Sequence, residues 1–303
     1  DPAPPVLEFD AAGNLVGSWG GRVAGAAYEW PGSNHGIVAD HKGFVWIGGN
    51  GGNDAHLLKF TRDGKFVAQY GKSGARRDPK STPEKPNYIA NSNDMDNFGR
   101  VAKMFIDPKA NEGRVAVIDL DNGKIKRMWG AYGKPPTDEP LGRYVPGQPP
   151  AQQFRNPVHC SEMSTDGMVY VCDRPNDRVQ VFTKDGKFVS EHFVEPTTLA
   201  DGSVWDIAFS KDAGQKYIYM ADGVNEHVRI FDRKSMTELT NFGYGGRQPG
   251  MFLGVHSIAT DSKGNIYTTE TYTGKRLQKF VFKGEGPVTA KKQGVPWPKT
   301  CGN

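Results

Sequence analysis

The sequence lacks several features that would define its class at once. No apolar run approaches the ~18–20 residues of a membrane-spanning helix, which predicts a chain without a membrane span. No block of basic residues is present, and the net charge of +4 is spread along the chain, which argues against a nucleic-acid partner. An initiator methionine and a signal sequence are also missing, and the start at Asp1 is typical of a processed end, compatible with export.

Cysteine is scarce, with three residues, and two of them fall on one predicted hairpin. A turn at residues 165–167 would pair Ser164 with Met168 and, counting outward, Cys160 with Cys172. Directly opposed cysteines can form a disulfide, and two buried free thiols are the alternative. Because a disulfide favours an oxidising compartment, we expect a periplasmic or secreted protein.

Glycine and proline are abundant, with 38 and 21 residues, and 37% of the chain is hydrophobic. This composition suits many short strands joined by tight turns. The best-formed segment runs from His159 to Val194 and reads as four strands, with Asp-Gly turns at Asp166–Gly167 and Asp185–Gly186. Apolar and polar residues alternate along its third strand, Arg178–Phe182, as a half-buried strand requires.

The same plan recurs along the chain. A weaker copy starts near Ala102, residues 6–20 match only the last two strands of a unit, and three clear copies start at His35, Trp205 and His256. Four-stranded units of roughly 40 residues in succession are typical of a β-propeller. We therefore predict an all-β fold and a single domain over residues 1–303, a six-bladed β-propeller with one or two incomplete blades. Five blades is the alternative.

Two stretches do not fit the repeat. Residues 72–97 are polar and rich in proline, asparagine and lysine, and residues 131–155 are rich in proline. Loops this long are uncommon in a compact domain and are often functional, so they could wall a site; surface insertions without a role are the alternative. The copy near Ala102 is also short, because Asn111–Arg114 runs almost directly into the third strand, and the second strand is missing or reduced.

Three of the seven histidines, His35, His159 and His256, occupy one equivalent position, at the start of a first strand. First strands line the axis of a propeller, so the three imidazoles would meet there. Neutral imidazoles bind zinc and other divalent transition metals, and three protein ligands leave one position open for water or substrate. The alternative for each histidine is a hydrogen-bonded structural role. The remaining histidines are interpreted as surface or loop residues: His41, His56, His192 and His227.

Charged residues at the ends of second strands are expected on the same face as the histidines. Arg174 is the natural partner of an anion, because a guanidinium binds a carboxylate in a fork. Glu270 or Asp173 could orient an imidazole or act as a general base. Asp222 and Asp206 belong to the same group by position. A salt bridge in a loop is the alternative for each of them.

These motifs resemble the NHL-repeat propellers, and within them peptidyl-α-hydroxyglycine α-amidating lyase and its bacterial relatives. The residues that carry the resemblance are Asp173-Arg174, the run Asn176–Phe182, and the histidine motifs Asn34–Ile37, Val158–Ser161 and Val255–Ile258. The resemblance implies a six-bladed propeller whose axial metal, usually zinc, is held by one histidine from each of three blades. It also implies cleavage of a carbinolamide C–N bond, which yields a peptide amide and glyoxylate.

The chain departs from that family at three places. The family's functional tyrosine falls in the segment that is short here, around Glu112–Arg114, and a second functional arginine belongs to early strands that are absent. The family has an aspartate after the third histidine that helps to hold a structural calcium, and this chain has Ser257. The resemblance therefore supports the transition-metal site more than the calcium site.

The sequence thus predicts a metal-dependent, lyase-like enzyme that performs C–N cleavage or hydrolysis on a small polar or carboxylate-bearing substrate. A non-catalytic NHL propeller that serves as a binding or scaffolding module is the alternative, because a fold alone does not specify function. Calcium-dependent lactonase propellers are a third interpretation. It is less favoured, because the repeated residue is histidine, whose nitrogen suits transition metals better than calcium.

Overall fold

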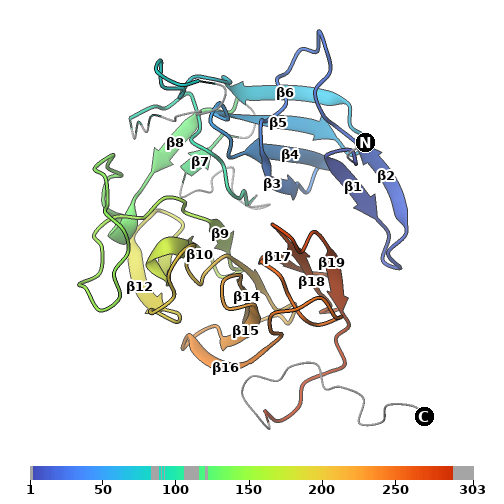
Figure 1. Ribbon diagram of the computed structural model, residues 1–303, viewed down its shortest axis with the longest axis vertical. Coiled ribbons are helices and arrows are strands. Elements are labelled where there is room, and N and C mark those ends of the chain that lie inside the picture. The colour runs from blue at the N-terminus through green and yellow to red at the C-terminus, as the bar shows by residue number, and fades with distance from the viewer. Residues whose placement is uncertain are drawn as a thin grey trace. The chain divides into compact units, whose positions relative to one another are not determined.

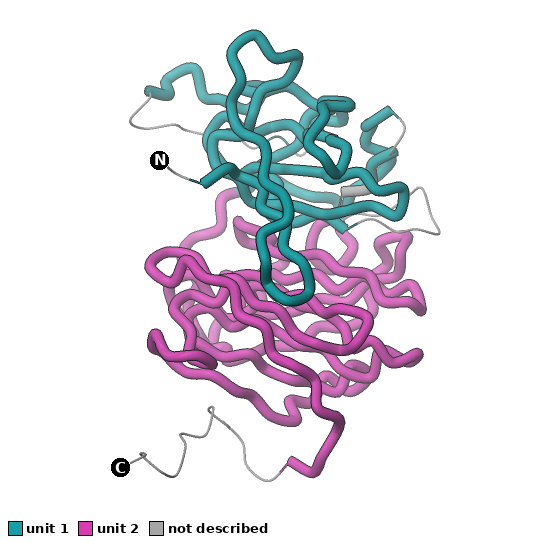
Figure 2. Tube along the Cα trace, turned by 90° about the vertical axis from the view of Figure 1, so that its right-hand side faces the viewer, with its two compact units in different colours: residues 1–129, 135–139 teal, residues 130–134, 140–303 magenta. Residues whose placement is uncertain are grey.

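The computed structural model describes residues 3–82, 89, 91, 93–105, 116–119 and 122–288. Its regular structure is nearly all β (Figure 1), and the helical turns in these ranges are two short 3-10 turns, η1 (Ala131–Gly133) and η2 (Arg174–Asn176). Within the same ranges no helix has the length and hydropathy that crossing a bilayer requires. The chain divides into two compact units (Figure 2): unit 1 is residues 1–129 and 135–139, and unit 2 is residues 130–134 and 140–303.

Unit 2 contains three successive antiparallel sheets, each with its strands ordered as they follow in the chain. The first holds β9 (Cys160–Met163), β10 (Met168–Asp173), β11 (Arg178–Thr183) and β12 (Phe188–Phe193). The second holds β13 (Asp206–Phe209), β14 (Tyr217–Asp222), β15 (His227–Asp232) and β16 (Thr237–Phe242). The third holds β17 (Val255–Thr260), β18 (Ile266–Glu270) and β19 (Leu277–Phe280). This up-and-down order is that of propeller blades.

Unit 1 contains one complete sheet of the same kind, made of β3 (Asn34–Ala39), β4 (Phe44–Gly49), β5 (His56–Thr61) and β6 (Phe66–Gly71). Two further sheets have two strands each: β1 (Val6–Phe9) with β2 (Leu15–Trp19), and β7 (Ala116–Ile118) with β8 (Ile125–Met128). The β1–β2 pair confirms that residues 6–20 form only part of a unit.

The described residues therefore contain four sheets of blade form, three with four strands and one with three. The β-propeller arrangement is confirmed at this level, and six blades stays a prediction. The weak copy near Ala102 has its last two strands as β7 and β8, and residues 102–105 form no strand. The short segment Asn111–Arg114 lies outside the described residues. Residues 131–155 contain no strand, as expected of an inserted loop.

The cores lie between neighbouring blades, and strand alternation explains how. Successive side chains of a strand point to opposite faces, so a middle blade packs against one neighbour with its odd positions and the other with its even positions. On β14, Ile218 and Met220 join the cluster shared with β9–β12, whereas Tyr219 and Ala221 join the cluster shared with β17–β19. A one-residue register slip would therefore exchange both cores at once.

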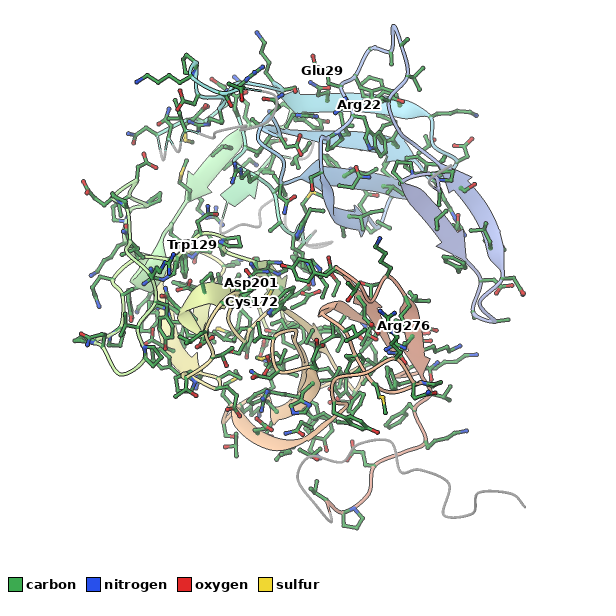
Figure 3. The ribbon with its side chains drawn as sticks, in the orientation of Figure 1. Arg22, Glu29, Trp129, Cys172, Asp201 and Arg276 are labelled. Carbon is green, nitrogen blue, oxygen red and sulfur yellow. A yellow bond between two sulfur atoms is a disulfide. The ribbon has the colours of Figure 1, made fainter. Side chains whose placement is uncertain are left out.

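The predicted hairpin between β9 and β10 is confirmed. The Ser164 amide donates to the Met168 carbonyl at 2.9 Å, and Cys160 lies directly opposite Cys172 in the strand register. The two cysteines form a disulfide, with 4.7 Å between their Cα atoms (Cys172 is labelled in Figure 3). The disulfide joins the start of β9 to the end of β10, next to the two segments that carry His159 and Arg174.

Candidate functional site

Two of the three predicted metal ligands meet within unit 2. His159 directly precedes β9 and is 3% exposed, while His256 is the second residue of β17 and is half-buried. Their ring centroids are 4.7 Å apart, with an interplanar angle of 70°. Their candidate ligand atoms lie within 4.8 Å of one another. The strand starts of two different blades thus place two imidazoles together, as the repeat predicted.

A hydrogen bond to the next blade sets the orientation of His159. Its Nδ1 lies 2.5 Å from the backbone carbonyl oxygen of Trp205, the residue that occupies the equivalent position in the following repeat. A carbonyl oxygen can only accept, so Nδ1 carries the proton and Nε2 is the ligand atom. This arrangement, in which one ring nitrogen is held by a backbone carbonyl, is the usual support of a metal-binding histidine.

His35 has the same local geometry within unit 1. Its Nδ1 lies 2.6 Å from the carbonyl oxygen of Ala102, which is again the equivalent position of the next repeat. His35 lies where the register between β3 and β4 shifts, and His256 lies at a similar shift between β17 and β18. Bulges of this kind re-aim side chains and are common beside functional sites. The Nδ1 of His256 instead contacts the Ser257 hydroxyl, at 3.1 Å.

Trp205 connects the histidine pair to the predicted anion partner. Its ring centroid lies 5.7 Å from that of His159 and 5.4 Å from that of His256. The Arg174 guanidinium lies over the Trp205 ring. Its central carbon is 4.5 Å from the ring centroid, within cation–π range. Of the three catalytic candidates, Arg174 is the one that contacts the same ring, Trp205, as His159 and His256.

Asp201 and Tyr272 join this cluster, although neither was predicted. Asp201 pairs with Arg174 at 3.3 Å, and the Tyr272 hydroxyl donates to the other oxygen of the same carboxylate at 2.8 Å (Asp201 is labelled in Figure 3). Tyr272 follows the end of β18 as Arg174 follows the end of β10, so the rule that selected Arg174 could also have selected Tyr272. Asp201 lies in the connection from β12 to β13 and has no sequence signal.

Asp173 is buried and fully engaged. Its carboxylate accepts from Arg178 Nε at 2.7 Å, from the Asn176 amide at 2.8 Å and from the Arg155 backbone N–H at 3.0 Å. Its exposed fraction is 0%. These contacts hold the η2 turn, which begins at Arg174, and the Asp173 carboxylate is buried away from solvent.

Glu270 is engaged in a similar way. It accepts from Arg276 Nε at 2.6 Å, from the Gln278 amide at 2.8 Å and from the Leu253 backbone N–H at 3.1 Å. Asp222, at the end of β14, pairs with Arg229 at 2.7 Å. In all three blades of unit 2, the acid that ends the second strand is therefore paired with an arginine that follows it.

Asp206 links two blades of unit 2 from within the core. It is 2% exposed, and it accepts the backbone N–H of Ile207 at 2.9 Å and that of Ile258 at 3.1 Å. Since Ile258 belongs to β17, this carboxylate ties β13 to the strand that carries His256. These contacts give Asp206 a structural role.

The interpretation of the other histidines as surface or loop residues is wrong for His56. This residue is 1% exposed in β5, and its Nε2 donates to the Glu29 carbonyl at 2.7 Å. His192 and His227 are half-buried strand residues, in β12 and β15. His41 is exposed in a turn, as expected.

Unit 1 also contains a cavity, of about 640 Å³. Its lining includes Tyr28, Trp30, Asn53 and the charged residues Arg22 and Glu29, which are labelled in Figure 3. None of the side chains that the sequence selected as site residues is part of this lining.

No family model matches the chain. Among solved structures, it is similar to virginiamycin B lyase from Staphylococcus aureus, with 15% identity, a TM-score of 0.46, and coverage of 83% of this chain and 71% of the other. It is also similar to a streptogramin B lyase, with 14% identity, a TM-score of 0.41 and 84% coverage of both chains. A protein from Lactobacillus plantarum has 12% identity, a TM-score of 0.46, and coverage of 89% and 75%. Likeness at this level assigns no activity.

Proposed function

We propose that this protein is a metal-dependent enzyme that cleaves a C–N bond in a small polar substrate, with His35, His159 and His256 as the metal ligands. The proposal includes the six-bladed propeller that the repeat predicts. Its main support is a hydrogen bond of the same kind at both His35 and His159. Each Nδ1 donates to the backbone carbonyl at the equivalent position of the next repeat, Ala102 for His35 and Trp205 for His159. Two histidines far apart in sequence are thus held in the same way, and a backbone carbonyl on one ring nitrogen is the usual support of a metal-binding histidine.

The donor set fits zinc or another divalent transition metal. Three neutral imidazoles are nitrogen ligands, whereas calcium takes oxygen ligands. Two nitrogens that each lie ~2.0–2.1 Å from one ion are at most ~4.2 Å apart. The ligand atoms of His159 and His256, within 4.8 Å of one another, need at most a small adjustment to share an ion. Such a metal would act as a Lewis acid on a substrate oxygen.

The roles of the remaining side chains follow from their contacts. Arg174 binds the carboxylate of the substrate, Asp173 holds the turn from which Arg174 projects, and Glu270 holds the segment before His256 through Leu253. The reaction is redox-neutral: the carbinolamide C–N bond breaks, the amide nitrogen gains a proton, and the hydroxyl loses one as it becomes the carbonyl of glyoxylate. Asp173 and Glu270 therefore act as positioning residues.

We also propose that the protein works outside the cytoplasm, in the periplasm or as a secreted protein. The support is the Cys160–Cys172 disulfide, because disulfides persist in oxidising compartments.

Metal analysis of purified variants tests the proposed site. We expect about one zinc per chain in the wild type, and loss of most of it in each single variant His35→Ala, His159→Ala and His256→Ala. His41→Ala is the matched control, because His41 is exposed and should leave the metal content unchanged. Full metal content in any one of the three variants would remove that residue from the site.

The reaction itself is tested by release of glyoxylate from an N-acylated α-hydroxyglycine. We expect release by the metal-loaded wild type and none by the three histidine variants. Bound metal without any glyoxylate release would reject the lyase reaction and favour a binding module.

A further inference from the structure

Arg174 is a buried cation with few partners. It begins η2, it is 8% exposed, and its side chain is 10% exposed. Among the described residues, its one ion pair is with Asp201, at 3.3 Å. Its buried Nε makes no hydrogen bond within the described part of the chain. A buried donor without a partner costs roughly 1–3 kcal/mol, and more for a charged group, so an anion placed here would recover a substantial free energy.

The other buried arginines of unit 2 are far better satisfied. Arg178 donates to Asp173, Glu191, the Tyr132 hydroxyl and the Gln153 carbonyl. Arg229 has three carboxylate partners, and Arg233 binds Asp166 and two backbone carbonyls. Burial lowers the pKa of Arg174, whereas for the other three the nearby partners outweigh burial and raise the pKa.

Asp201 places its own carboxylate between Arg174 and Tyr272. Its Oδ1 faces Arg174 Nη2, and its Oδ2 accepts the hydroxyl of Tyr272 at 2.8 Å. The two oxygens of one planar group thus bridge a guanidinium, which itself lies over the Trp205 ring, and a phenol. The hydrogen bond to Asp201 raises the pKa of Tyr272, so Tyr272 stays a protonated donor.

The backbone around Asp201 is held, so its side chain alone can leave the site. Ala200 and Gly202, on either side, have φ of 61° and 79°. A Cβ at Gly202 would lie 2.0 Å from the Arg174 carbonyl oxygen, so this close approach requires glycine. The Gly202 carbonyl accepts from the Trp205 indole at 2.7 Å. The Asp201 side chain itself is 43% exposed and can rotate into solvent.

We propose that Arg174, Trp205 and Tyr272 form a subsite for a small carboxylate ligand, and that Asp201 is a built-in competitor that occupies this subsite until the ligand displaces it. The inference rests on the proposed function only in taking Arg174 as the partner of the substrate carboxylate. It adds the residues that set affinity for that group, and carboxylate binding at this subsite does not require the metal.

Isothermal titration with N-acetylglycine at constant ionic strength tests the subsite, with neutral N-acetylglycinamide as the control ligand. The full chain is titrated as purified and again in the presence of a chelator. In both titrations we expect N-acetylglycine to bind and N-acetylglycinamide not to bind. Asp201→Asn should tighten binding roughly three- to fivefold, the ratio expected from losing one half-exposed ion pair. Arg174→Met should abolish binding, in the wild type and in the Asp201→Asn background.

Three outcomes would overturn the proposal: wild-type affinity in Arg174→Met, an unchanged or weaker affinity in Asp201→Asn, or sulfate binding as tight as that of N-acetylglycine. Arg174→Lys keeps the charge and controls for folding, together with thermal unfolding of each variant. A chain that binds N-acetylglycine but no zinc rejects the proposed metal enzyme and leaves the subsite standing. A chain that binds zinc through its histidines but binds no carboxylate rejects the subsite and leaves the proposed metal site standing.

Discussion

Arg174 and Arg178 lie four residues apart, at the two ends of one short turn, and both are buried, yet their surroundings differ completely. Arg178 is 0% exposed and every branch of its guanidinium has a partner. Arg174 stacks on Trp205, and its ion pair with Asp201 is long, at 3.3 Å. The difference teaches how to separate structural from functional charges: a buried charge whose hydrogen bonds are complete holds the fold, and one whose bonds are incomplete is available to a ligand.

The largest expected effect on stability comes from removing Arg178, the cation whose hydrogen bonds are complete. Arg178→Met would leave the Asp173 carboxylate buried without its counterion, and breaking a buried pair on one side costs about 3–5 kcal/mol. Urea unfolding should show this loss in the free energy of unfolding. A loss below ~1 kcal/mol would mean that the Asp173–Arg178 cluster does not hold the turn.

The disulfide is expected to have the next largest effect, because it fixes the strand end from which both arginines extend. Cys160→Ala with Cys172→Ala opens a loop whose ends are 12 residues apart in sequence, and loops of this size are worth about 3 kcal/mol. Thermal unfolding of the double variant, and of the wild type with and without reductant, measures the effect. If reductant lowers the melting temperature of the double variant as much as that of the wild type, the disulfide is not the cause.

A third test uses the other acid of the same turn. Asp177 is buried, one of its oxygens accepts the Ser203 N–H, and its Oδ2 has no hydrogen-bond partner within the described part of the chain. Burial raises the pKa of Asp177 to about 7. The folded protein then binds a proton that the unfolded chain has already lost, so this residue's contribution to stability is present below about pH 4 and disappears as the pH rises through about 7.

Asp177→Asn should remove this pH dependence. The shift corresponds to at most ~4 kcal/mol, and we expect the variant to be about 2 kcal/mol more stable than the wild type at pH 8. The difference between variant and wild type should shrink as the pH falls toward 4, measured by urea unfolding across that range. A constant difference at all pH values would show that the Asp177 carboxyl does not titrate in this window.

The smallest effect on stability is expected for Arg174. Arg174→Met replaces an incompletely bonded cation by an apolar chain of similar length, a change that is often neutral or stabilising. We expect the free energy of unfolding to change by less than ~1 kcal/mol, against the large loss in Arg178→Met. Equal losses in the two variants would remove the distinction between a structural and a functional arginine.

Much of the fold could be predicted because its signals are local. Asp-Gly turns and alternating strands gave the blades of unit 2, and counting outward from one turn placed Cys160 opposite Cys172. The repeat also placed His159 and His256 at equivalent strand starts. The hydrogen-bond and ion-pair partners of the charged side chains could not be predicted in this way. The partners of Arg178 include Tyr132, 46 residues away, and Asp201 meets Tyr272 across 71 residues.

The amino-acid sequence by itself determined the blade pattern, the histidine positions and the register that sets Cys160 opposite Cys172, because turn chemistry and two-residue alternation act over a few neighbouring residues. Only the tertiary structure decided which charges are complete and which are open to a ligand. The packing of separate blades brings distant donors and acceptors together, and a buried group keeps only the partners that this packing supplies. For that reason Asp173 and Glu270 hold strand ends, whereas Arg174 is left facing a carboxylate that a ligand can replace.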